Sequence, residues 1–109
     1  ADQRHDHYLR NVDFIQRYIF PGGCLPSVSQ MATLLARETD MQLVRLHDHG
    51  QHYARTLDMW AANLLATRDE AIAITSPEVY ERYMKYLTGC ADFFRRGITN
   101  IGQFTLVKP

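Results

Sequence analysis

The sequence predicts an α/β fold with about four helices and two short strands. Most of the chain repeats its apolar residues every three or four positions, as amphipathic helices do, and two short runs have the composition of strands. A pair of strands alone is marginal in water, and strands that are apolar on both faces need further strands beside them and helices over them. We therefore expect the two strands to complete a larger sheet that this chain does not contain.

The first third of the chain predicts two helices. The first spans residues 5–20, and its apolar face carries Tyr8, Val12, Ile15 and Ile19. It should end at residues 21–23, Pro-Gly-Gly, because proline disfavours a helical residue before it and glycine readily takes positive φ. The second helix starts after Ser27, whose hydroxyl can cap the N–H of Gln30 while the Gln30 side chain reaches back. It should end near residues 38–40 and bury Val28, Met31, Leu34 and Leu35.

The middle of the chain predicts a strand, a loop and a long helix. Residues 41–46 form the strand, with four buried positions, Met41, Leu43, Val44 and Leu46. The polar stretch 47–53 is predicted to be a loop, with Gly50 as its flexible point. The helix then spans residues 54–73, with an apolar face of Leu57, Trp60, Ala61, Leu64, Leu65 and Ile72.

The last helix has a well-defined start and end. Ser76 is expected to cap it and Pro77 to occupy its first position. The basic residues 95–96 followed by Gly97 are typical of a helix C-terminus. Three tyrosines recur along it, and we expect the first two to pack in the core: Tyr80, Tyr83 and Tyr86. A final strand over residues 100–108 carries Phe104 and Leu106 on one face, and Ile101 and Val107 on the other.

Composition excludes several classes of function. The 109 residues carry 12 basic and 12 acidic side chains, a formal net charge of zero, whereas a phosphate-binding groove needs a basic excess. We expect no nucleic-acid partner and, without a run of about 20 apolar residues, no transmembrane segment. The polar N-terminus is not a secretory signal, and two distant cysteines form no disulfide framework, so a cytoplasmic location is expected. The chain begins at Ala1, which suggests a piece of something longer.

Candidate catalytic or metal-binding residues are few. Three histidines could ligate a metal or simply be solvated, and we predict no metal site: His47, His49 and His52. His5 and His7 are expected to be solvated. Cys24 is an activated thiol if it lies at a helix N-terminus, but a small apolar filler is the favoured interpretation. No G-x-G-x-x-G turn follows a strand, so no dinucleotide site is predicted.

Four blocks of sequence resemble the C-terminal portion of cyclopropane fatty acid synthases, and they occur in the family's order. They are YIFPGGCLPS from Tyr18, HGQHYARTLDMWAANL from His49, SPEVYERYMKYLTGCADFF from Ser76 and QFTLVKP from Gln103. The third block is especially similar to the mycolic acid cyclopropane synthase and methyltransferase branch. The resemblance covers about residues 13–108, and four ordered blocks are more specific than any single motif in the chain.

The resemblance implies the C-terminal part of a doubly wound S-adenosylmethionine-dependent methyltransferase fold, whose last two strands form an antiparallel pair. Residues 41–46 and 100–108 would be that pair, and residues 1–109 would be the C-terminal segment of one methyltransferase domain. The family transfers a methyl group from S-adenosylmethionine to the double bond of an unsaturated acyl chain. A bound bicarbonate then takes a proton as a cyclopropane ring closes, or water captures the cation and a methyl branch remains.

Two site residues are carried over from the family. Tyr53 matches the tyrosine of the H-Y-x-x-T-L stretch that helps to hold bicarbonate, and a phenolic O–H suits an oxyanion because it adds no charge that opposes the cation. Phe20, in Y-I-F-P-G-G, matches a residue near the acyl pocket whose ring face could steady a carbocation. The alternatives are a core tyrosine and hinge packing. The family's glycine-rich cofactor loop, acidic ribose ligand and other bicarbonate ligands have no counterpart in this chain.

We therefore predict the C-terminal portion of a cyclopropane-synthase-like methyltransferase that supplies an acyl-pocket lid and one bicarbonate ligand. The chain alone is expected neither to bind S-adenosylmethionine nor to catalyse. The partner would be an unsaturated acyl lipid, with peripheral membrane contact and self-association as open possibilities. An alternative from another class is a free-standing, non-catalytic module that binds a lipid or a protein through its apolar faces. The acyl carrier and the choice between ring and methyl branch stay open.

Overall fold

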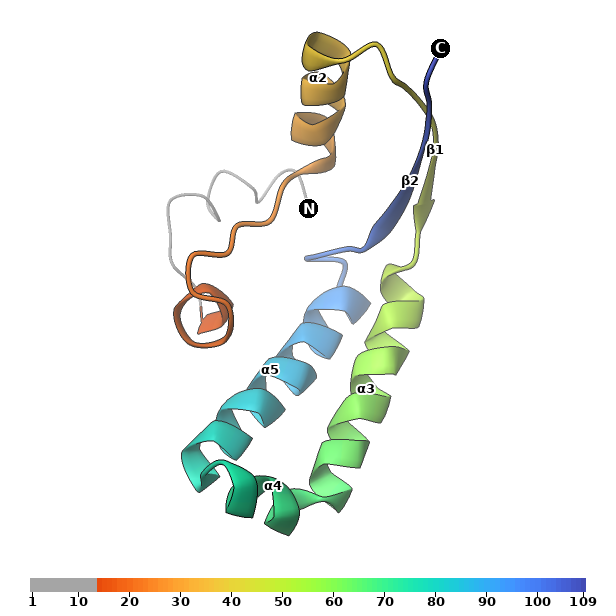
Figure 1. Cartoon of the computed structure of the whole chain (residues 1–109). Coiled ribbons are helices and arrows are strands. Elements are labelled where there is room, and N and C mark those ends of the chain that lie inside the picture. The colour runs from red at the N-terminus through yellow and green to blue at the C-terminus, as the bar shows by residue number, and fades with distance from the viewer. Residues whose placement is uncertain (1–13) are drawn as a thin grey trace.

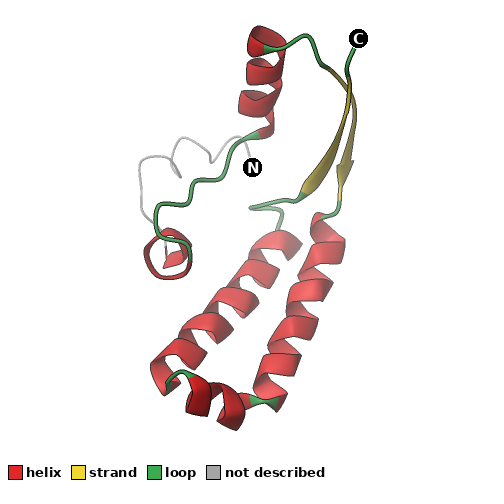
Figure 2. Ribbon diagram, in the orientation of Figure 1, coloured by secondary structure: helices red, strands yellow, loops and turns green. Residues whose placement is uncertain are grey.

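The computed structural model describes residues 14–109 and has the predicted α/β architecture. The elements, in chain order, are η1 (Ile15–Ile19), α2 (Val28–Glu38), β1 (Gln42–Asp48), α3 (Gly50–Ala66), α4 (Arg68–Ile74), α5 (Pro77–Arg95) and β2 (Gly102–Val107). Helices α3 and α5 run side by side as a hairpin that α4 closes at one end (Figure 1). The β1–β2 pair extends from the other end of the hairpin, near α2 (Figure 2).

The core lies between α3 and α5. Its buried residues come from both helices: Ala54, Leu57, Ala61, Leu87, Cys90, Ala91 and Phe94. Small alanine side chains let the two helices approach closely, and the larger side chains fill the space between them. The predicted burial of Leu57 and Ala61 is confirmed. Trp60 and Leu65 are 47% and 59% exposed, so their assignment to the buried face was wrong, because the face that α5 covers is narrower than the apolar stripe of the sequence.

The predicted single helix over residues 54–73 is wrong at its start and in its middle, and its end is right to within one residue. It begins earlier, at Gly50, and it divides at Thr67 into α3 and α4. The backbone N–H and the hydroxyl of Thr67 both donate to the carbonyl of Asn63, at 3.2 and 3.0 Å. A hydroxyl that competes for helical carbonyls in this way favours the end of a helix.

The predicted loop over residues 47–53 is also wrong. His47 and Asp48 belong to β1, and the first turn of α3 takes up most of the remainder. The Asp48 carboxylate accepts the N–H of Gly50 at 2.8 Å, which satisfies one of the donors that a helix start leaves unpaired. The polar composition therefore marked a side-chain-stabilised helix start rather than an irregular segment.

The predicted boundaries of helix α5 are confirmed. The Ser76 hydroxyl accepts the N–H of Val79 at 3.1 Å, Pro77 occupies the first turn, and Gly97 takes a positive φ of 70° after the last turn. Tyr80 is buried, as predicted, and the guanidinium of Arg68, the first residue of α4, lies 5.4 Å from its ring centroid. Tyr83 is 43% exposed, so its predicted place in the core was wrong.

The two strands pair antiparallel, as expected from the resemblance. The register joins Leu43 to Leu106 and Arg45 to Thr105, so that Val44 forms a bulge between them. Every residue of β1 is exposed, and the predicted burial of Leu43, Val44 and Leu46 was therefore wrong, while Met41 is half-buried. The physical reason is that, among the described elements, no layer covers either face of this pair beyond its limited contact with α2.

Helix α2 has the predicted start but no buried residue. Its cap is the Ser27 hydroxyl, which accepts the N–H of Gln30 at 3.1 Å. We call the exposed apolar side chains of α2 and β1 the open face; they are Val28, Leu34, Leu43, Val44 and Leu46. The predicted burial of Val28 and Leu34 was wrong, because the limited contact of α2 with β1 buries none of its residues.

The first predicted helix is described only in its last part. Tyr8 and Val12 lie outside the described residues, and residues 15–19 form a short π-helix, η1, that packs on α5. Ile19 is buried, and the element ends at Phe20, after which Gly22 takes a positive φ of 81°. No helix of residues 14–109 combines the length and apolar character needed to cross a membrane.

Candidate functional site

Tyr53 lies in the first turn of α3, where its N–H donates to the carbonyl of His49 at 2.9 Å. Its side chain is half-buried and packs against the core. The ring is edge-on to Phe94 of α5 and to Trp60 of α3, with centroids 5.0 and 6.0 Å away. Such edge-to-face contacts hold an aromatic ring in a defined orientation. Tyr53 is therefore a packed residue on the rim of the core, and its proposed ligand role stays a prediction.

A shallow depression, open to solvent, lies beside Tyr53. Residues of α3 and of the segment that enters β2 line it: His49, His52, Tyr53, Thr56, Ile101 and Gln103. Tyr53 and Thr56 are three positions apart, which places them on the same side of the helix. The H-Y-x-x-T spacing noted in the sequence therefore brings two hydroxyl-bearing residues to one depression, next to the apolar Ile101.

Phe20 lies where η1 ends, and its N–H donates to the carbonyl of Ile15 at 2.7 Å. Its side chain is 57% exposed. One contact orients the ring: it is edge-on to Tyr86 of α5, with centroids 6.0 Å apart and an interplanar angle of 85°. The residue is thus largely exposed and contacts a neighbour on another element, and its expected place near the acyl pocket stays a prediction.

Tyr86 links the two predicted site residues, and sequence reasoning did not single it out. Besides its contact with Phe20, it packs against the same core cluster as Tyr53. Burial raises the pKa of Tyr86, and the negative charges that Cys90, Tyr53 and Tyr83 carry when ionised raise it further. The phenol therefore stays neutral and able to donate. The sequence did contain a signal for Tyr86. Tyr86, Cys90 and Phe94 recur at steps of four and form a stripe that faces Tyr53 across the hairpin.

Two cationic side chains of α5 hold η1 against the hairpin. The Lys85 ammonium lies 4.3 Å from the ring centroid of Phe14, and the Arg82 guanidinium lies 5.6 Å from that of Tyr18. Cation–π contacts at such distances stabilise by about 0.5–1 kcal/mol each at exposed sites. They attach the segment that carries Phe20 to the helix that carries Tyr86.

The three histidines considered for a metal lie near one another but do not form a site. The rings of His47 and His49 are 4.0 Å apart, and that of His52 is 6.5 Å from His49. A ring nitrogen of His49 is hydrogen-bonded to the amide oxygen of Gln103 at 2.9 Å. Across residues 14–109, no group of three His, Cys, Asp or Glu side chains is arranged to hold a metal ion.

Cys24 is exposed, so its expected role as an apolar filler was wrong. It lies in the extended connection between η1 and α2, three residues before the Ser27 cap. It therefore does not occupy the helix N-terminus that thiol activation would need. The buried small thiol of the molecule is Cys90, in the α3–α5 core.

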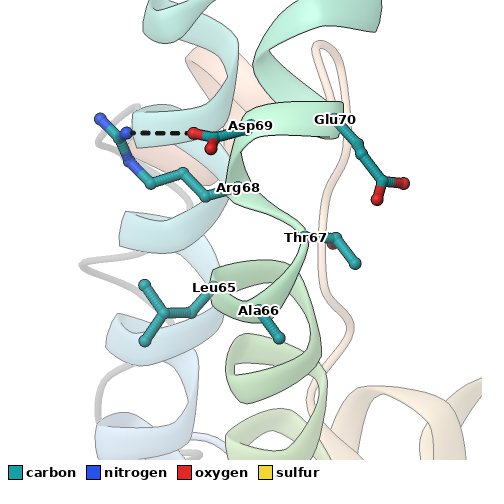
Figure 3. A pocket seen from close by; sticks show the side chains of 6 residues that line it. All are labelled: Leu65, Ala66, Thr67, Arg68, Asp69 and Glu70. Atoms are coloured by element: carbon teal, nitrogen blue, oxygen red, sulfur yellow. Dashed lines mark ion pairs between the residues drawn. The ribbon is translucent and has the colours of Figure 1, made fainter.

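A second depression lies at the junction of α3 and α4, and its lining is six consecutive residues, 65–70. Figure 3 shows Arg68 reaching toward Asp69, and the two side chains form an exposed ion pair at 3.8 Å. Neither predicted site residue lines this depression. We take it to be the concave outer side of the helix break at Thr67.

The described residues do not fit S-adenosylmethionine by themselves. In doubly wound folds the nucleotide-like part of such a ligand sits at a glycine-rich turn from a strand to a helix. Within residues 14–109, the chain passes directly from a strand to a helix where β1 leads into α3, and this turn consists of His49 and Gly50. Asp48 accepts the Gly50 N–H there, so the turn offers a carboxylate rather than a row of free amides.

Comparison with known proteins identifies the family. The family model described as mycolic acid cyclopropane synthetase matches residues 1–104. The chain belongs to the mycolic acid cyclopropane synthetase family. The chain is similar to the S-adenosylmethionine-dependent methyltransferase UmaA of Mycobacterium tuberculosis. The two are 51% identical over 92% of the chain and 35% of that protein. It is also 53% identical to cyclopropane mycolic acid synthase 3 over 87% of the chain and 33% of that protein.

Solved structures of the family match the fold. Mycolic acid cyclopropane synthase CmaA1, complexed with SAH and CTAB, superposes with a TM-score of 0.85 and 46% identity over 94% of the chain and 35% of that structure. The cyclopropane synthase MmaA2 from Mycobacterium tuberculosis superposes with a TM-score of 0.86 and 44% identity, over 99% of the chain and 40% of that structure. The chain thus spans about a third of the length of the relatives it matches, and its fold is part of theirs.

Proposed function

We propose that the chain is the C-terminal segment of an S-adenosylmethionine-dependent methyltransferase that modifies the double bond of an unsaturated acyl chain. The observation that carries this proposal is the placement of Tyr53. It is half-buried against Phe94 and lines a depression with Thr56, within a chain that matches the family over residues 1–104. The cofactor site would come from the remaining two-thirds of the protein, because the described turn between β1 and α3 does not fit it.

In this proposal Tyr53 is one ligand of bicarbonate. Its O–H donates to the oxyanion and so orients it toward the proton that leaves as the ring closes. A neutral donor suits the task, because a negatively charged group would repel the bicarbonate and a positive charge would oppose the cation. Thr56 lines the same depression and can supply a second hydroxyl.

Phe20 and Tyr86 would form an aromatic wall of the acyl pocket. The Phe20 ring is exposed and is held edge-on by Tyr86, so a face remains open to an apolar chain. An aromatic face stabilises a nearby cation without bonding to it. Because Phe20 precedes residues 21–23, Pro-Gly-Gly, we propose that this segment is the lid over the acyl chain. A cytoplasmic location is part of the same proposal.

The test is Tyr53→Phe in the intact protein that carries this chain. Loss of a single oxyanion donor costs about 100-fold in kcat, so we expect a loss of that order in methylene transfer to a cis-unsaturated acyl substrate, followed by mass spectrometry. Tyr83→Phe is the matched control, because Tyr83 does not line the depression beside Tyr53 and the variant keeps the ring that contacts Tyr86. Equal activity of Tyr53→Phe and wild type would contradict the assignment of Tyr53.

The open face favours a second candidate function, a non-catalytic module that binds a lipid or a protein. Exposed apolar residues on two neighbouring elements are typical of a surface that another molecule covers. Calorimetric titration with S-adenosylmethionine distinguishes the two candidates. The methyltransferase proposal expects no saturable heat from the 109-residue chain and saturable binding by the intact protein. Absence of binding by both would favour the module.

A further inference from the structure

The start of α3 is tied to the loop between α5 and β2 by one carboxylate and one amide. One oxygen of Asp48 accepts the N–H of Gly50 at 2.8 Å, and the other accepts from the side-chain amide of Asn100, also at 2.8 Å. The Asn100 oxygen accepts the N–H of Ile101 at 3.1 Å. Asp48 and Asn100 thus connect two segments that lie 52 residues apart in sequence.

Gly50 makes this connection possible. It is buried, and a Cβ at this position would overlap the Oδ1 of Asn100 and lie 3.3 Å from the Oδ1 of Asp48. The hydrogen bonds from Gly50 and then from Asn100 lower the pKa of Asp48, so the carboxylate remains ionised and keeps both acceptors. Bonds to a charged acceptor are stronger than neutral ones.

Two further bonds reinforce the same junction. The N–H of His49 donates to the carbonyl of Ile101 at 2.9 Å, and the amide of Gln51 donates to the carbonyl of Phe94 at 3.1 Å. Phe94 is also the ring on which Tyr53 packs. The first turn of α3 is therefore fixed to the last turn of α5 and to the entry of β2 before the chain reaches Tyr53.

We propose that Asp48 and Asn100 form a clamp that positions Tyr53 at its depression, which makes Asp48 a positioning residue for the reaction. Neither clamp residue lines the depression, whereas His49 and Ile101, their immediate neighbours, do. The clamp sets the positions of His49 and Ile101 relative to the Tyr53 ring, and the backbone N–H of Tyr53 donates to the carbonyl of His49 at 2.9 Å. The link to catalysis rests on the function proposed above for Tyr53; the positioning itself does not.

The experiment measures ring position and turnover separately, in the intact protein. Wild type, Asp48→Ala and Asn100→Ala are compared by the 19F resonance of fluorotyrosine at position 53 and by kcat and KM. Displacing a reacting group by about 1 Å costs on the order of 100-fold, so we expect a shifted or broadened resonance and a 10- to 100-fold lower kcat, with KM within about twofold. Asp92→Ala, which removes an exposed carboxylate of α5, is the matched control and should change neither.

Exchanging the two residues of the clamp distinguishes a loss of positioning from a general loss of structure. The double variant Asp48→Asn with Asn100→Asp keeps one amide and one carboxylate opposite each other, and it should recover the resonance and at least half of the lost kcat on a logarithmic scale. If Asp48→Ala fails to fold, Asn100→Ala still tests the clamp, because it keeps the Asp48–Gly50 bond. An unmoved resonance in a folded single variant, whatever its kcat, overturns the proposal. A moved resonance with full activity of Tyr53→Phe supports the clamp and contradicts the proposed function.

Discussion

The α3–α5 hairpin and the open face are built from the same kinds of residue but differ in what surrounds them. Leu57 of the hairpin has no exposed surface, whereas Leu34 of α2 and Leu46 of β1 are 44% and 43% exposed. Both regions have regular backbone hydrogen bonding and capped helices. The difference teaches that an apolar sequence pattern alone does not decide burial, because Leu34 and Leu46 fit such a pattern and no described residue buries them.

The largest expected effect comes from truncating a buried side chain of the hairpin, compared with truncating an exposed side chain of the open face. Leu57→Ala removes a fully buried side chain and should lower the free energy of unfolding of the 109-residue chain by about 2–5 kcal/mol. Leu34→Ala removes a side chain that is already partly in water, so we expect a change within about 0.5 kcal/mol. Urea unfolding measures both. Equal decreases in the free energy of unfolding would show that α2 shares the core of the hairpin. They would remove the distinction between the hairpin and the open face.

Two matched helix caps sharpen the comparison. Ser76 of α5 and Ser27 of α2 each accept an N–H at 3.1 Å. Ser76→Ala should cost about 1 kcal/mol in unfolding of the chain, because α5 is half of the core. Ser27→Ala should lower the helicity of α2 seen by circular dichroism and leave that unfolding transition in place. A large shift of the transition by Ser27→Ala would contradict the independence of α2.

The junction between the two regions should be sensitive to acid. The lowered pKa of Asp48, caused first by the Gly50 N–H and then by Asn100, means that its ionised form stabilises the fold. This stabilisation is present above the unfolded-state pKa near 3.8 and is lost as the pH falls through the lower folded-state value. The difference in stability between wild type and Asp48→Asn should therefore be constant near neutral pH and shrink below it. Thermal unfolding from pH 7 to pH 2 measures this, and a constant difference throughout would contradict it.

The smallest expected effect concerns the ion pair between the two helices of the hairpin. The Arg95 guanidinium lies 2.7 Å from the Asp58 carboxylate, but both side chains are about half exposed. Exposed pairs of this kind contribute about 0–1 kcal/mol. A double-mutant cycle of Arg95→Ala and Asp58→Ala should give a coupling energy in that range, falling in high salt. A much larger coupling would mean that polar contacts, and not Leu57 and its neighbours, hold the hairpin together.

The sequence was informative wherever local chemistry decides the structure. The caps at Ser27 and Ser76 and the helix end at Gly97 were predictable, because each depends on a few adjacent residues. The break at Thr67 was not, since helical periodicity continues through it. The positions of β1 that were expected to be buried are exposed, because the alternation of apolar residues does not say which element covers them.

The candidate site was predictable only in part. The H-Y-x-x-T spacing and the family resemblance pointed to Tyr53, but no local pattern pairs Phe20 with Tyr86, which lies 66 positions further along the chain. The bond between Asp48 and Asn100 spans 52 residues and was equally invisible. Contacts of this range depend on how α5 returns alongside α3, and that requires the fold.

Hydrogen exchange of the backbone amides tests the central claim most directly, with the 109-residue chain and the intact protein compared under the same conditions. Amides of α3 and α5 should be protected in both, because the residues that bury one another in this core all lie on these two helices. Those of α2, β1 and β2 should be protected strongly only in the intact protein, where we propose that other residues of the domain cover the open face. Equal protection of α2 and the strands in both would contradict the account.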